Sequence, residues 1–255
     1  MNFRTAAILL LGAAIFTGCA AGPRTSGQVV VHTFTHDSAN AYLLVQGSAS
    51  LLIDSGYEKN GPALEKDIRG AGVDPQSLRA IVLTHGHGDH AGGSRHFRTH
   101  FGTRVIAGRG DRDMLAAGRN EPLCPTGILG KLRRGTDQNA SFTPTQADVW
   151  VDAPLPLFEL TGVDATAVPI PGHTKGSLMI VAGQMVFVGD LFRGSLIGSS
   201  AETHFYMCDL EGNRRDIASL LEQQKATTTV FFTGHFGPLT RAAVAEHFGV
   251  RPTKP

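Results

Sequence analysis

The chain has 255 residues, with 23 Lys and Arg against 22 Asp and Glu and a formal net charge of +1 at pH 7. This near-neutral balance, with no run of five or more basic residues, lacks the electrostatic footprint of a nucleic-acid binder, so we expect no nucleic-acid partner. Without an amino-terminal leader, about 237 residues remain, which suits one α/β domain and requires no second one.

The amino terminus has the pattern of a leader. Met1 to Arg4 precede an apolar stretch over 6–16, which at about 11 residues is too short for a bilayer that needs about 20. We predict a signal peptide over 1–18. The segment Phe16-Thr17-Gly18-Cys19 resembles a bacterial lipobox, whose cysteine becomes lipidated.

This resemblance leads us to expect a lipid anchor at Cys19, a flexible tether over 19–28, and a domain over 29–255. The domain would belong to the bacterial cell envelope, membrane-anchored and facing the periplasm or the exterior. Plain secretion and a buried amino-terminal helix are the alternatives.

The first half of the domain reads as strands followed by a helix. Segments rich in branched and aromatic residues and divided by Gly, Ser and Asn predict strands over 29–34, 41–46 and 50–53. A helix is expected over 62–71, with Gly72 as its stop. The short apolar run 80–83 then predicts a buried strand.

Directly after that run comes Thr84-His85-Gly86-His87-Gly88-Asp89-His90, which places four metal-binding side chains within six residues. Imidazole nitrogens with a carboxylate are typical of catalytic sites for zinc and related ions. Gly86 and Gly88 let the backbone bend sharply, so that neighbouring side chains can converge. A solvated loop or a dinucleotide-binding loop is the alternative, but histidines crowd the position that a phosphate would take.

The elements beyond this loop are less regular. Helices are predicted over 93–101 and 111–117 with a strand over 103–107 between them. Residues 118–147 form a long, poorly patterned insertion and are our candidate for a flap that shapes the substrate site. Its dense basic cluster, Lys131 to Arg134, is interpreted as a solvated face, with an anion-binding or membrane-facing role as the alternative.

The second half repeats the alternation of apolar runs and polar turns. It predicts strands over 164–170, 178–181, 185–188 and 229–233, and a helix over 213–224. Three of the apolar runs are followed by one more metal candidate each, namely His173, Asp190 and His235. Each is weak evidence taken singly, because structural histidines and turn aspartates are common, but a sheet can gather them at one end of its strands.

Together these motifs resemble the metallo-β-lactamase superfamily, whose pattern is His-x-His-x-Asp-His, a later histidine, an aspartate and a final histidine. The resemblance includes Leu52 to Gly56 and Pro171 to Ser177 and covers roughly 29–239. It implies a four-layer αββα sandwich with the metals at one edge between two sheets. Periodicity alone gives only a mixed α/β domain.

The resemblance also implies a role for each ligand. His85, His87 and His173 would hold a first divalent ion, and Asp89, His90 and His235 a second, with Asp190 bridging the two. Asp54 would orient a ligand without touching metal. The ions would be zinc, with iron or manganese as alternatives, because these ligand types accept all three.

Such a site is expected to act as a binuclear hydrolase. A metal lowers the pKa of bound water to about 7, so that a metal-bound hydroxide is available as nucleophile. Asp89 and Asp190 are the carboxylates that we assign to catalysis. A Gly-x-Ser-x-Gly elbow is absent, and Cys124 and Cys208 lack a cysteine-protease context.

The substrate is expected to be a small ester, thioester or lactone. Asp190 favours the branch with glyoxalase II, lactonases and phosphodiesterases over β-lactamases, which usually carry cysteine or serine there. Only 20 residues follow His235, where glyoxalase II has a helical domain. The nucleases of the superfamily carry an added domain that this chain lacks.

Four residues beside the metal motifs are candidates for substrate contact: Lys175, Arg193, His204 and Tyr206. His204 has an ordinary loop histidine as its alternative. Two rival functions are an iron oxygenase of the persulfide dioxygenase type with a single iron, and a non-catalytic lipoprotein that uses the fold for binding. Cys124 and Cys208 could pair in an oxidising compartment, which their spacing leaves open.

Overall fold

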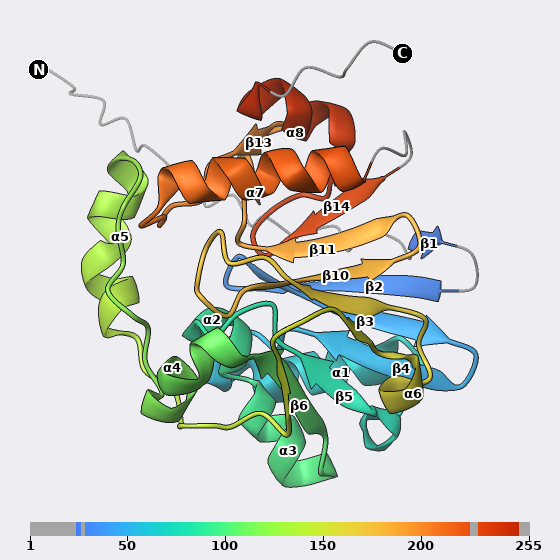
Figure 1. Ribbon diagram of the computed structural model, residues 1–255. Helices are drawn as coiled ribbons and strands as arrows, with labels where there is room; N and C mark the ends of the chain where they lie inside the picture. Colours follow the sequence, from blue (N-terminus) through green and yellow to red (C-terminus); the bar gives the residue numbers. More distant parts are fainter. Residues whose placement is uncertain (1–23, 27–28, 225–228, 250–255) are drawn as a thin grey trace, which may run out of the picture.

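The computed structural model describes residues 24–26, 29–224 and 229–249. The predicted signal peptide, the lipidation site at Cys19 and most of the predicted tether lie outside these residues. Two mixed sheets face each other, and helices cover their outer faces (Figure 1). This is the four-layer αββα arrangement that the resemblance implies. None of the helices in the described ranges has the length and apolar character needed to cross a membrane.

The first sheet has seven strands in the order of the sequence. They are β1 (Arg24–Ser26), β2 (Val29–His36), β3 (Ala39–Gln46), β4 (Ala49–Ile53), β5 (Ala80–Val82), β6 (Arg104–Gly108) and β7 (Val149–Val151). The strands from β1 to β4 pair antiparallel, whereas β4, β5, β6 and β7 run parallel.

The second sheet has six strands in the order β15-β14-β11-β10-β9-β8. They are β8 (Leu155–Pro156), β9 (Thr166–Pro169), β10 (Leu178–Ala182), β11 (Met185–Gly189), β14 (Val230–Thr233) and β15 (Leu239–Thr240). Only β11 and β14 pair in parallel. A separate ribbon joins β12 (Arg193–Gly194) to β13 (Ala201–Glu202).

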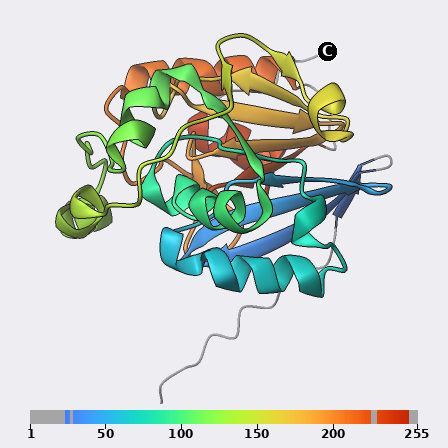
Figure 2. The same ribbon diagram turned by 90° about the horizontal axis from the view of Figure 1, so that it is seen from below.

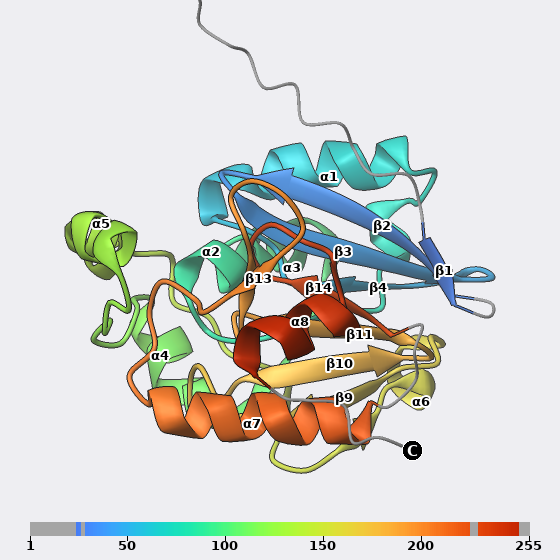
Figure 3. The same ribbon diagram turned by 90° about the horizontal axis from the view of Figure 1, so that it is seen from above.

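Helices form the two outer layers. Seen from below, α1 (Gly61–Gly70) and α3 (Ser94–Phe101) lie against the first sheet (Figure 2). Seen from above, α7 (Leu210–Gln223) and α8 (Arg241–Phe248) cover the second sheet (Figure 3). The remaining helices are short or peripheral: α2 (Gly88–Ala91), α4 (Arg112–Ala117), α5 (Ile128–Asn139), α6 (Phe158–Thr161) and the 3-10 turns η1 (Glu58–Asn60), η2 (Pro75–Ser77) and η3 (Arg109–Asp111).

The central strands of both sheets carry apolar side chains on both of their faces. In β3, Tyr42 and Leu44 point into the core between the sheets, whereas Leu43 points into the core under α1 and α3. In β11, Phe187 faces the first of these cores and Val186 faces the core under α7 and α8. Successive side chains of a strand point to opposite faces, so a strand covered on both sides reads as a continuous apolar run.

Most predicted elements agree with the structure to within a few residues, but the insertion does not. Residues 118–147, predicted to be poorly patterned, contain the 12-residue helix α5. Its Ile128 and Leu132 side chains are exposed, so α5 lacks the buried apolar stripe by which a helix is usually recognised. This helix projects from the layers beside the loop that precedes α7 (Figure 1).

A disulfide ties the insertion to the second half of the chain. Cys124 and Cys208, 84 residues apart in sequence, are bonded. The Met207 amide donates to the Cys124 carbonyl at 2.8 Å beside this bond. Because disulfides persist in oxidising compartments, the bond favours a location outside the cytoplasm.

Candidate metal centre

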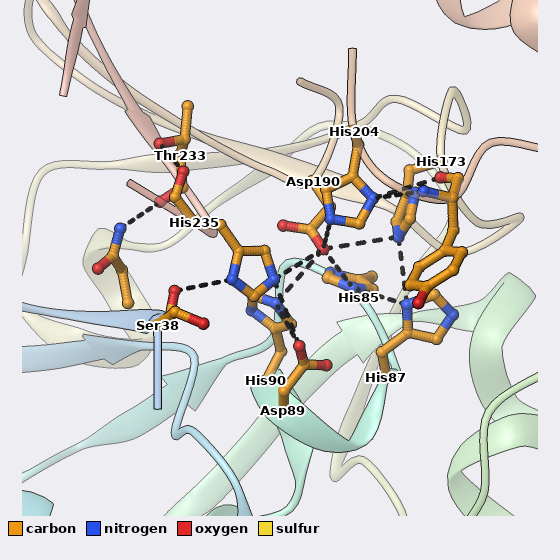
Figure 4. Close-up of polar contacts among 12 residues, drawn as sticks. Ser38, His85, His87, Asp89, His90, His173, Asp190, His204, Thr233 and His235 are labelled. Carbon is orange, nitrogen blue, oxygen red and sulfur yellow. Dashed lines mark hydrogen bonds and ion pairs between the residues drawn. The ribbon is translucent and has the colours of Figure 1, made fainter. Parts of the chain in front are cut away.

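The candidate ligands lie where parallel strands end. The loop with His85, His87, Asp89 and His90 follows β5, and its neighbour β4 ends just before Asp54. In the other sheet, β11 leads to Asp190 and the adjacent parallel strand β14 leads to His235. Carboxyl ends of parallel strands meet at one sheet edge, and the seven predicted ligands accordingly gather in one cluster (Figure 4).

The first group of ligand atoms consists of three imidazole nitrogens and one carboxylate oxygen. His87 Nδ1 lies 3.1 Å from His85 Nε2 and 3.2 Å from His173 Nε2. Asp190 Oδ2 lies 3.6 Å from His85 Nε2 and 3.8 Å from His173 Nε2. All four ligand atoms lie within 4.8 Å of one another.

The second group shares the same carboxylate oxygen. His235 Nε2 lies 3.3 Å from Asp89 Oδ2 and 3.4 Å from Asp190 Oδ2. His90 Nε2 lies 3.8 Å from Asp89 Oδ2 and 3.5 Å from Asp190 Oδ2. Asp190 Oδ2 therefore stands between the two groups.

These residues fit divalent ions. Zinc–nitrogen bonds of about 2.0–2.1 Å in a tetrahedron separate the ligand atoms by about 3.3 Å, close to the separations in both groups. The Nε2 atoms of His90 and His204 are buried and form no hydrogen bond. Because buried polar atoms are normally satisfied, such atoms in a ring of inward-facing ligands indicate a place for a cation.

Carboxylate and carbonyl oxygens fix the outward-facing sides of several rings. Asp54 Oδ2 accepts a hydrogen bond from the Thr84 hydroxyl at 2.7 Å and lies 2.9 Å from His90 Nδ1. His235 Nδ1 lies 2.8 Å from the Ser38 carbonyl oxygen. An oxygen on one ring nitrogen holds the proton there and leaves the other nitrogen free to bind metal.

The pKa values of the histidines differ between the two groups. Burial lowers the pKa of His87 to about 4, and burial followed by the nearby His90 holds the pKa of His85 well below its ordinary value. Burial also acts to lower the pKa of His235, but the Asp190 and Asp89 carboxylates outweigh it and raise that pKa to about 10. The same balance raises the pKa of His90. The carboxylates therefore favour the protonated imidazoles in the second group, whereas burial favours the neutral ones in the first.

Asp111, at the end of η3, joins the two ligand loops and was not identified from the sequence. Its Oδ2 accepts from the Gly86 amide and from the Thr174 hydroxyl, each at 2.8 Å, and its Oδ1 accepts from the Gly176 amide at 2.8 Å. Burial raises the pKa of Asp111 against these hydrogen bonds, which lower it. The sequence predicts Asp111 only as the first residue of the helix over 111–117. Its role in joining the two ligand loops is evident only from its contacts in the fold.

A pocket opens beside the cluster. Its lining includes His87, Asp89, Asp190, His204, His235, Tyr57, Asn120, Leu123, Arg133, Asp137, Ala140, Phe205 and Tyr206. Two of the four substrate candidates, His204 and Tyr206, are therefore at the pocket. Lys175 is exposed and is not part of this lining.

Arg193, the fourth substrate candidate, is buried and has other partners. It pairs with Glu202 across the β12–β13 ribbon, and its guanidinium lies 4.1 Å from the centre of the Phe205 ring. The structure thus places it behind the pocket wall rather than in the lining.

Comparisons with known proteins agree with this geometry. The model of the metallo-β-lactamase superfamily matches residues 34–235. A Bacillus subtilis protein named "Probable metallo-hydrolase YqgX" is 29% identical over 175 residues, covering 65% of this chain and 74% of the relative. The hydroxyacylglutathione hydrolase GloC of Haemophilus influenzae is 27% identical over 123 residues, covering 47% of this chain and 53% of that protein.

Solved structures show the same fold. A metallo-β-lactamase of Cronobacter sakazakii with a HARLDQ motif superposes with a TM-score of 0.62 at 21% identity, covering 87% of each chain. With the family model matching most of the chain and two ligand groups that share one carboxylate, the protein belongs to the metallo-β-lactamase superfamily and is a binuclear metal-dependent hydrolase.

Proposed function

We propose that the protein hydrolyses a small ester, thioester or lactone, and that Asp190 bridges the two metal ions. The observation that carries the proposal is the position of Asp190 Oδ2, which lies within 3.8 Å of ligand nitrogens from both groups. His85, His87 and His173 hold the first ion, and Asp89, His90 and His235 hold the second. Zinc suits this ligand set.

A bound pair of divalent ions would supply an acidified water as nucleophile and polarise the substrate carbonyl oxygen. The residues of this chain contribute position and charge. Asp190 carries a negative charge that both ligand groups share and so fixes their spacing. Asp89 lines the pocket, where its carboxylate accepts a hydrogen bond from the attacking water and orients it. Asp54 holds the His90 ring through the 2.9 Å contact to Nδ1.

The pocket supports a small acyl compound as substrate. Leu123, Phe205 and the two tyrosines Tyr57 and Tyr206 supply apolar surface, and Asn120 adds an amide. Arg133 and Asp137 add charged groups, and apolar walls combined with placed polar groups are typical of sites for small molecules. The likeness to a hydroxyacylglutathione hydrolase adds support for a thioester.

The test combines metal analysis with a substrate panel. Purified protein should hold close to two ions per chain and hydrolyse at least one ester, thioester or lactone. Asp190→Ala should retain fewer ions and lose this activity, whereas Asp164→Asn, an exposed aspartate, should match the wild type. Hydrolysis restricted to β-lactams, one iron per chain with oxygen consumption, or full metal content without turnover would each refute the proposed substrate class.

We also propose that the protein is anchored in the cell envelope through a lipid on Cys19 and faces the periplasm or the exterior. The support is the lipobox-like segment in the sequence and the disulfide between Cys124 and Cys208. Mass spectrometry of the amino-terminal peptide from the membrane fraction should show an acylated Cys19, and Cys19→Ser should release the protein from that fraction. An unmodified Cys19 in membrane-bound protein would contradict the anchor.

A further inference from the structure

His204 lies inside the ligand cluster although the superfamily pattern does not include it. Its Nε2 lies 3.0 Å from Asp190 Oδ2. The nitrogens of the predicted ligands His85, His90, His173 and His235 lie 3.4–3.8 Å from this oxygen. Its side chain is 4% exposed. The ring lies against two ligand rings, with centroids 4.8 Å from His173 and 5.5 Å from His235 (Figure 4).

The environment of His204 matches that of the predicted ligand His235. His235 directs Nδ1 at the Ser38 carbonyl oxygen and Nε2 at Asp190. His204 places Nδ1 3.3 Å from both the carbonyl oxygen and the amide nitrogen of Tyr206, and Nε2 at the same Asp190 oxygen. In the tautomer in which Nδ1 donates to the Tyr206 carbonyl, Nε2 presents its lone pair to the cluster, as in metal-ligating histidines.

Within the described residues, His204 Nε2 faces the Asp190 carboxylate. His204 Nε2 is buried and makes no hydrogen bond of good geometry. Its ligand atom lies within 4.8 Å of those of Asp190 and His235, so the three form a group that can hold one ion. The 3.0 Å separation from Asp190 Oδ2 is near the distance of about 3.3 Å between ligands of one zinc ion.

The insertion fixes the backbone of His204. The Thr126 hydroxyl donates to the His204 carbonyl at 2.5 Å, and the Thr126 amide donates to the Phe205 carbonyl at 2.9 Å. The disulfide to Cys124 lies four residues beyond His204 in the chain. The ring is therefore held in place from a segment that is remote in sequence from every predicted ligand.

We infer that His204 is an eighth protein ligand of the metal centre, on the ion shared with Asp190 and His235. This assignment rests on the ligand set proposed above. With it, the ion held by Asp190 and His235 gains one further imidazole ligand. The extra imidazole competes with water for the open coordination position, and it favours metals that accept five or six ligands over strictly four-coordinate zinc.

The experiment measures metal binding without substrate. Metal-free wild type, His204→Ala and His204→Gln are titrated with Co²⁺, following the visible absorption bands of the ion and the two binding constants. We expect His204→Ala to weaken the second equivalent by about tenfold or more, to leave the first within about twofold, and to alter the d–d bands of the second ion. His204→Gln, which keeps a ligating oxygen, should recover part of the affinity.

His247→Ala serves as the control, because His247 is an exposed histidine of α8. Unfolding curves and circular dichroism of the metal-free proteins check that each variant folds. If His204→Ala and His204→Gln bind both equivalents like the wild type with unchanged bands, His204 is not a ligand, even if KM for a substrate changes. If the wild type itself binds no second ion, the proposed binuclear site fails instead.

Discussion

Asp111→Asn tests whether one buried carboxylate holds the two ligand loops together. The asparagine oxygen can replace Oδ2 and keep the hydrogen bonds from Gly86 and Thr174. Its NH2 group then replaces Oδ1 and faces the Gly176 amide, which donated to that oxygen at 2.8 Å. Two donors would therefore oppose each other in a site where Asp111 is 2% exposed.

The size of the effect follows from these contacts. A buried donor left without an acceptor costs about 1–3 kcal/mol, and removing the charge recovers part of the cost of burying it. We expect Asp111→Asn to lower the free energy of unfolding by about 2 kcal/mol, which for a chain of this size lowers the Tm by roughly 4–8 °C. Asp111→Ala removes the acceptor of all three hydrogen bonds and should lower the free energy of unfolding by about twice as much.

Thermal unfolding of the metal-free proteins, followed by circular dichroism, measures this effect. Asp164→Asn is the matched control, because Asp164 is exposed and, among the described residues, its carboxylate forms no hydrogen bond or ion pair. Because Gly86 and Thr174 flank ligands of the first ion, zinc affinity at that site should also fall. A Tm within 1 °C of the wild type together with unchanged zinc affinity would refute the role assigned to Asp111.

Three further predictions concern the metal centre and its supports. Gly234→Ala should strongly reduce metal content, because an added Cβ would lie 2.1 Å from Asp190 Oδ1. Metal analysis checks this, with Gly135→Ala as the control because nothing lies within 4 Å of a Cβ there. Equal metal content in the two variants would contradict the prediction. Metal binding at the second site should release protons at pH 7–8, because His90 and His235 have raised pKa values and must be deprotonated to bind metal. The metal affinity of this site should therefore rise with pH. Calorimetry in buffers of different ionisation enthalpy measures this, and no proton release would argue against the assignment. The double variant Cys124→Ser, Cys208→Ser should lower the free energy of unfolding by about 2–5 kcal/mol, because the disulfide joins residues 84 apart in the chain. Denaturant unfolding with and without reductant measures this. An unchanged unfolding midpoint would show that the disulfide does not stabilise the fold.

The metal motif and the sheet strands were predictable because their signals are local. His85 to His90 concentrates ligands within one loop, and buried strands such as β5 and β11 appear as apolar runs whatever packs on them. Residues 241–248 were missed as a helix, although α8 packs Val244 and Ala245 into the core under the second sheet. Four of its apolar residues are consecutive, Ala242 to Ala245, so they give little helical periodicity.

The sequence by itself determined the fold class, the family and the kinds of ligand, because these depend on residue types in order along the chain. Only the tertiary structure determined which single residues support or join the centre. Asp111 reaches Gly86 and Gly176 across 25 and 65 residues of sequence, and His204 reaches Asp190 through a loop held by the insertion. Such contacts form only where the two sheets and the disulfide bring segments together that are distant in sequence. A local sequence pattern does not show which distant segments will meet.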